Sequence, residues 1–133
     1  MVDVLHKGKE KSYRGIEIEE LKKLDLREFA KLVKSRPRRA ILRNYDILEK
    51  FVKRSEKKLA KDKLIKTHDR ELIIVPKMVG KTIYIYNGKE YEKVLIIEQM
   101  LGHRLGEFAL TRKIAKHTKA GVGATKSSAS KKK

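Results

Sequence analysis

The chain has 133 residues, the size of one ordinary domain with a single modest core. Lys and Arg number 35 against 17 Asp and Glu, so the formal net charge is +18 at pH 7, which favours an anionic partner. The absence of cysteine excludes disulfides, thiol nucleophiles and zinc ribbons.

The helical N-terminal part is predicted to span residues 12–60, after a flexible segment at 1–11. Apolar residues recur at helical spacing in two short pieces, and Asp25 followed by Glu28 has the pattern of a capping box at the start of the second. Pro37 then interrupts, and one longer helix with a wide basic side is expected to follow. Its apolar stripe consists of Ile41, Leu42, Tyr45, Leu48, Val52 and Leu59.

Residues 61–110 are predicted to hold the β-structure. The apolar run 72–75 is typical of a buried strand. Segments 82–86 and 91–97 flank Asn87-Gly88, which predicts a β-hairpin with a type I′ turn because Asn-Gly readily supplies its two positive φ angles.

A compact loop is predicted after this hairpin. Residues 98–101 match a single helical turn, and Gly102 and Gly106 frame a loop expected to need the conformational freedom of glycine. Glu107 is predicted to be a buried glutamate that holds this loop. Beyond it no carboxylate occurs, so residues 111–133 are expected to form a basic tail that is disordered when alone.

Two tyrosines alternate with two isoleucines in the first hairpin strand. Tyr84 and Tyr86 therefore lie on one face, and Ile83 and Ile85 lie on the other. The tyrosines could form a stacking platform for RNA bases, although the RNP signature is absent, or they could pack under the helices. The sequence leaves both interpretations open.

Four arginines gather near the predicted start of the longer helix: Arg36, Arg38, Arg39 and Arg43. Helix N-termini favour phosphate, and the planar guanidinium group binds two phosphate oxygens at once. The alternative is a solvated basic face. Contact with RNA is favoured because the cluster has no nearby acidic residue to neutralise it.

No catalytic, metal or cofactor site is predicted. The four histidines lack the i, i+4 spacing of a helical metal pair, and they are His6, His68, His103 and His117. His103 could pair with Glu98 or Glu107 in acid–base chemistry, but nothing else supplies a nucleophile or an oxyanion site. The glycine-rich stretch 121–126 lacks the spacing of a phosphate-binding loop.

Nucleic acid is favoured over an acidic membrane as the partner. The chain has no Trp, and its charge is spread over loops and a tail instead of one basic amphipathic helix. No apolar run reaches the length of a signal or a membrane span, so we expect a soluble, cytoplasmic protein that does not bind a membrane. A DNA-coating protein would satisfy the same charge, which leaves it as the rival to an RNA-binding one.

Three segments resemble a single family. They are KTH at 66–68, IIVPKMVGKTIYIYNGKEY at 73–91 and MLGHRLGEFALTRK at 100–113. They are similar to the signature of the universal small-subunit ribosomal protein S nineteen, and the GHxxGEF element makes the match specific. The matching positions are Pro76, Val79, Gly80, Asn87, Gly88, Met100, Gly102, His103, Gly106, Glu107, Phe108, Thr111 and Arg112.

The rest of the chain resembles the archaeal and eukaryotic branch of that family. The extension YRGIEIEELKKL and the later run GVGATKSS are typical of this branch, and the last three lysines look archaeal. The resemblance covers residues 13–128. It departs from the bacterial pattern at Leu110, where proline is usual, and at the long N-terminal part.

The resemblance implies a small α+β fold, in which a three-stranded, mostly antiparallel sheet packs with helices. It also implies binding to 16S-type rRNA in the head of the small ribosomal subunit, a neighbouring ribosomal protein S thirteen, and a tail that extends towards the decoding region and tRNA. We expect no homo-oligomer. The side chains expected to contact rRNA are Arg36, Arg38, Arg39, Arg43, Lys66, Arg70, Lys77, Lys81, His103 and Arg104. Those of the tail are Arg112, Lys113, His117, Lys119 and Lys126.

Overall fold

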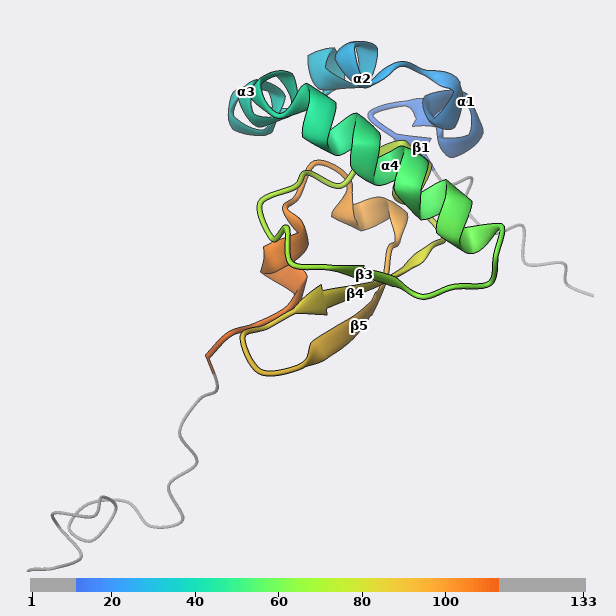
Figure 1. Ribbon diagram of the computed structural model, residues 1–133. Coiled ribbons are helices and arrows are strands. Elements are labelled where there is room, and N and C mark those ends of the chain that lie inside the picture. The colour runs from blue at the N-terminus through green and yellow to red at the C-terminus, as the bar shows by residue number, and fades with distance from the viewer. Residues whose placement is uncertain (1–11, 113–133) are drawn as a thin grey trace, which may run out of the picture.

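The computed structural model describes residues 12–112, in which a short hairpin and four helices precede a three-stranded sheet (Figure 1). The expectations for residues 1–11 and for the tail beyond Arg112 lie outside the described residues. The hairpin joins β1 (Ser12–Tyr13) to β2 (Ile16–Glu17). The helices are α1 (Ile18–Lys23), α2 (Leu26–Leu32), α3 (Ser35–Arg43) and α4 (Tyr45–Leu59). The main sheet contains β3 (Ile65–Thr67), β4 (Thr82–Tyr86) and β5 (Tyr91–Leu95).

The two short N-terminal helices agree with the sequence pattern. The predicted capping box is present at the start of α2, where the Asp25 N–H donates to Glu28 Oε2 at 3.3 Å. The prediction of a single longer helix is wrong, because this segment forms two helices, α3 and α4, on either side of Asn44. Asn44 adopts φ −104° and ψ 27°, outside the helical region, and asparagine suits the start of a helix better than its interior. Two members of the predicted apolar stripe, Leu42 and Leu59, are exposed.

The hairpin is confirmed, but its turn differs from the prediction. Tyr86 pairs with Tyr91, so four residues connect the antiparallel strands β4 and β5. Gly88 has a positive φ of 99°, whereas Asn87 does not. Asn87 uses its side chain instead, since Oδ1 accepts from the N–H groups of Lys89 and Glu90 at 3.0 and 2.9 Å. Asparagine stabilises the turn by this local capping and not by a left-handed backbone.

The third strand is not the one predicted. Residues 72–75 are buried as expected, but only one isolated bridge, between Ile73 and Arg104, gives this run any strand character. The third strand is β3, which pairs in parallel with β4, so the sheet is mixed with the order β3-β4-β5. Its sequence Ile-Lys-Thr is too short and too polar to stand out as a strand.

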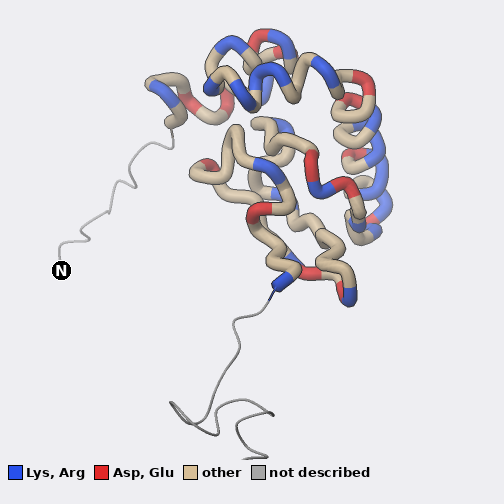
Figure 2. Tube along the Cα trace, turned by 90° about the vertical axis from the view of Figure 1, so that its left-hand side faces the viewer, with Lys and Arg blue, Asp and Glu red and all other residues tan. Residues whose placement is uncertain are grey.

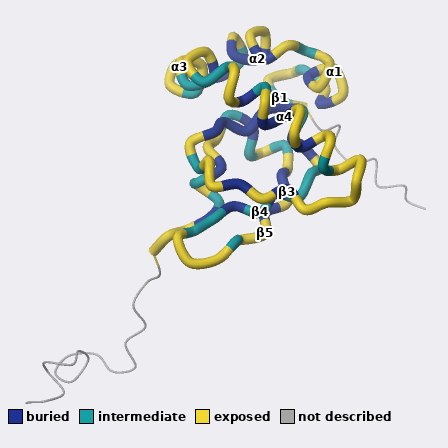
Figure 3. The backbone as a smooth tube through the Cα atoms, viewed as in Figure 1, coloured by how far each residue is buried: buried dark blue, intermediate teal, exposed yellow. Residues whose placement is uncertain are grey.

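The helices and the sheet share one core. Ile83 and Ile85 of β4 are 0% exposed and belong to the same apolar cluster as Leu48 and Val52 of α4. Burying each isoleucine stabilises the fold by roughly 1.5–3 kcal/mol. The helices lie on one side of the sheet, and the other side is free of them (Figures 1 and 3). The alternation that buries the isoleucines therefore directs Tyr84 away from the helices.

Candidate nucleic-acid interface

Helix α3 presents all four of its arginines to solvent because a single buried residue anchors it. Ile41 is 1% exposed and packs in the core, while Arg36, Arg39 and Arg43 are exposed. The first turn contains no acidic residue. Lys and Arg also recur along the neighbouring helices (Figure 2). The helix therefore displays cationic groups that lack acidic partners on the same turn.

Three of the four arginines of α3, Arg36, Arg39 and Arg43, line a hollow of about 420 Å³. Arg104, from the loop that follows β5, also lines this hollow. The part of the chain that the structure describes contributes one carboxylate to the lining, that of Glu71. We call this site the arginine hollow and define it by Arg36, Arg39, Arg43 and Arg104. Four guanidinium groups around one open space give a strongly anion-attracting site.

The loop that carries Arg104 is fixed by backbone hydrogen bonds to the segment 70–74. The Ile74 N–H donates to the His103 carbonyl at 2.8 Å, and the Gly106 N–H donates to the Arg70 carbonyl at 2.8 Å. Gly102 has a φ of 79°, which satisfies the predicted need for glycine. Gly106 has another role, because a Cβ there would lie 3.0 Å from the Arg70 carbonyl oxygen.

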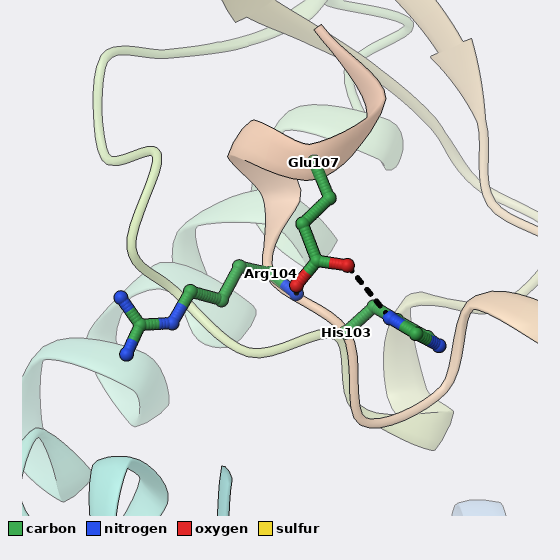
Figure 4. A network of polar contacts seen from close by, with 3 residues as sticks. All are labelled: His103, Arg104 and Glu107. Carbon is green, nitrogen blue, oxygen red and sulfur yellow. Dashed lines mark hydrogen bonds and ion pairs between the residues drawn. The ribbon is translucent and has the colours of Figure 1, made fainter. Parts of the chain in front are cut away.

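The Glu107 carboxylate holds this loop by contacts to two of its residues (Figure 4). One oxygen accepts the Arg104 N–H at 3.1 Å, and the other lies 2.7 Å from His103 Nδ1. The Arg104 N–H lowers the pKa of the Glu107 carboxyl, and the His103 contact lowers the same pKa further. The predicted loop-holding role is confirmed, but Glu107 is exposed and not buried. Because the carboxylate engages only the backbone of Arg104, that guanidinium group extends away from it (Figure 4).

Comparison with known proteins assigns the family. The family model described as Ribosomal protein S19 matches residues 34–117. A small ribosomal subunit protein uS19 of Picrophilus torridus is 49% identical over 122 residues, covering 92% of this chain and 80% of the relative. The chain belongs to the ribosomal protein S19 family. A second uS19 protein, from Halorubrum lacusprofundi, is 44% identical over 126 residues and covers 91% of this chain and 89% of its own length.

Membership of the S19 family makes the chain a structural constituent of the small ribosomal subunit in translation, and not an enzyme. As such it binds rRNA within the subunit. The DNA-coating interpretation and the acid–base interpretation of His103 are thereby set aside. Within residues 12–112, no group of three or more His, Asp or Glu side chains is arranged to hold a metal ion. No helix in the same range is long and apolar enough to cross a membrane.

Arg70 differs from the other predicted rRNA-binding residues of this S19 family member, because its guanidinium group is directed into the fold. Nη1 donates to the Tyr86 carbonyl at 2.6 Å, and Nη2 donates to the carbonyls of Gly106 and Ala109, the former at 2.9 Å. The side chain thus ties the end of β4 to the loop that precedes the tail. Arg70 is therefore not a candidate for contact with RNA.

The remaining predicted residues lie outside the arginine hollow. Lys81 has 17% of its side chain accessible, and its amine lies 3.8 Å from Glu56 Oε1. Burial lowers the pKa of Lys81, and Glu56 opposes that shift. Lys77 is half-buried, whereas Arg38 and Arg112 are exposed. The predicted tail residues Lys113, His117, Lys119 and Lys126 lie outside the described residues.

His103 and Lys66 each lie beside aromatic rings. The His103 ring meets the Phe108 ring edge-on with centroids 6.0 Å apart, and it lines a shallow hollow with Ile97 and Gln99. Lys66 Nζ lies 5.1 Å from the Tyr91 ring centroid. Arg54 and Lys58 were not among the predicted RNA-binding residues, and they line a separate hollow of about 230 Å³ beside β3. Their i, i+4 spacing on one helix face was the available signal.

Proposed function

We propose that the chain binds 16S-type rRNA in the head of the small subunit, and that the arginine hollow receives phosphates of the folded RNA. The observation that carries the proposal is the convergence of Arg36, Arg39 and Arg43 with Arg104 around one open space. The guanidinium fork matches a pair of phosphate oxygens. Since phosphate and 2′-OH contacts carry no base code, recognition should follow RNA shape more than sequence.

We further infer ribosomal protein S thirteen as a neighbour and a route for the basic tail towards the decoding region and tRNA. The family resemblance supports both. The tail's charge supports the second, since residues 111–133 contain no carboxylate. A protein that ends at Arg112 should still bind rRNA but should lose crosslinks to tRNA in assembled subunits. Unchanged tRNA crosslinks would contradict the role of the tail.

A binding experiment tests the hollow. The double variant Arg39→Gln and Arg43→Gln should bind a small-subunit head rRNA fragment at least tenfold more weakly than the unchanged protein, since charged hydrogen bonds are worth roughly 1.5–3 kcal/mol each. Lys61→Gln, which removes an exposed charge just beyond α4, is the matched control and should bind like the unchanged protein. Duplex DNA serves as competitor. A preference for the DNA, or equal losses in the variant and the control, would contradict the proposal.

A further inference from the structure

The face of the main sheet that the helices leave open carries an ordered set of aromatic and cationic side chains. The strand register aligns Lys66 of β3 with Tyr84 of β4, and Tyr84 with Lys93 of β5. It also aligns Tyr86 with Tyr91. Because neighbouring side chains alternate between faces and the isoleucines of β4 are buried, these five side chains share the outer face.

Contacts between rings continue this face beyond the strands. The His68 ring lies 4.4 Å from the Tyr86 ring and 5.4 Å from the Tyr91 ring, between centroids. His68 Nε2 is 2.6 Å from the Tyr91 hydroxyl, and the Tyr86 hydroxyl donates to the Gly88 carbonyl at 2.9 Å. We call His68, Tyr84, Tyr86 and Tyr91 the aromatic platform. His68 is exposed and the tyrosines are half-buried, so part of the platform faces solvent.

Cations border the platform. Lys66 Nζ lies 5.1 Å from the Tyr91 ring centroid, and Lys93 is exposed on β5. Beside β3, Arg54 and Lys58 of α4 line the hollow of about 230 Å³ together with Lys66 and His68. The only carboxylate that the described part of the chain contributes to its lining is that of Asp69, which already accepts the Thr67 hydroxyl at 3.4 Å. Among the described residues, none of these three cations of the hollow forms an ion pair with a carboxylate.

We propose that the aromatic platform binds unpaired bases of RNA, and that the cations beside it bind the adjoining phosphates. The proposal rests on the RNA-binding function above and adds a second site of different chemistry. Exposed rings stack on any base, while neighbouring cations follow the backbone of a single strand. The combination of rings with unpaired cations fits a single-stranded polyanion better than a protein surface. The arginine hollow, by contrast, has no aromatic side chain in its lining within residues 12–112.

Binding of two RNA ligands distinguishes the aromatic platform from the arginine hollow. One is a short oligouridylate, and the other is a duplex RNA of equal charge. The variant Tyr84→Ile, Tyr91→Ile removes two rings but keeps β-branched strand formers. It should bind the oligouridylate at least tenfold more weakly, because losing the stacking of one base already weakens binding by about tenfold, and it should bind the duplex unchanged. Tyr84→Phe, which keeps the ring, should bind the oligouridylate more tightly than Tyr84→Ile. Tyr13→Ile, on the separate hairpin β1–β2, controls for loss of a half-buried tyrosine.

Tyrosine fluorescence gives a direct readout of stacking. The chain has no Trp and five Tyr, three of which are on the platform, so bound oligouridylate should quench most of the emission. Thermal unfolding of each variant verifies that it is folded at the assay temperature. The proposal is overturned if the folded platform variant keeps its affinity for both RNA ligands, or if its affinity for both falls equally. It is also overturned if platform residues in assembled subunits crosslink only to protein. If the unchanged protein binds no RNA at all, the proposed function itself fails.

Discussion

Replacing Arg70 tests whether its side chain stabilises the fold by joining the end of β4 to the loop that precedes the tail. The guanidinium group donates to the carbonyls of Tyr86, Gly106 and Ala109, which lie 16, 36 and 39 residues further along the chain. A hydrogen bond to a charged group contributes roughly 1.5–3 kcal/mol. The side chain is half-buried, so water can replace part of these bonds. We therefore expect Arg70→Ala to lower the free energy of unfolding by about 3–4 kcal/mol.

Urea denaturation measures this loss, with the midpoint and the slope fitted separately. The melting temperature should fall by roughly 12–32 °C, since about 4–8 °C corresponds to 1 kcal/mol in a domain of roughly 100 residues. Arg70→Lys keeps the charge but not the planar fork, so we expect an intermediate loss. Arg38→Ala, at an exposed position, is the control and should cost at most about 0.5 kcal/mol. A loss below about 1 kcal/mol for Arg70→Ala would refute this reasoning.

Three further changes test the loop and the helices. The folded state lowers the pKa of Glu107 below its usual 4.5, so its contribution to stability is present above that pH and is lost as the pH falls below it. Glu107→Gln should therefore flatten the acid limb of the stability–pH curve measured by thermal unfolding, and an unchanged limb would contradict this. Asp25→Ala should cost about 1 kcal/mol in urea denaturation through loss of the capping box, and no loss would count against that cap. Gly106→Ala should lower the free energy of unfolding by about 1–3 kcal/mol, because its methyl group would meet the Arg70 carbonyl oxygen at 3.0 Å. Gly15→Ala has open space for its methyl group, so it would show only the strain of its positive φ.

Local patterns in the sequence predicted much of the fold. The capping box at Asp25 and the alternation of Ile83 with Tyr84 depend on neighbours in the chain, and both are confirmed. The parallel pairing of β3 with β4 depends on contacts across the sheet, which no local pattern encodes. The break at Asn44 was missed because the apolar spacing continues across it and conceals the change of helix.

The candidate interface divides in the same way. The arginines of α3 could be predicted as a group because they lie close in the sequence. Their convergence with Arg104 could not, because it depends on the loop held by Glu107. Charge alone also could not separate Arg70 from its neighbours, since its role comes from three carbonyls brought together by folding. A basic residue that follows a strand can therefore form hydrogen bonds within the fold as readily as it can bind RNA.

The salt dependence of rRNA binding tests the arginine hollow most directly. The slope of log K against log salt should become shallower by about 0.7–0.9 for each phosphate contact removed. We expect this change as Arg36, Arg39, Arg43 and Arg104 are replaced by Gln one after another, while Lys61→Gln leaves the slope as it is. A slope that stays constant through the whole series, with all variants folded, would contradict phosphate binding by this hollow.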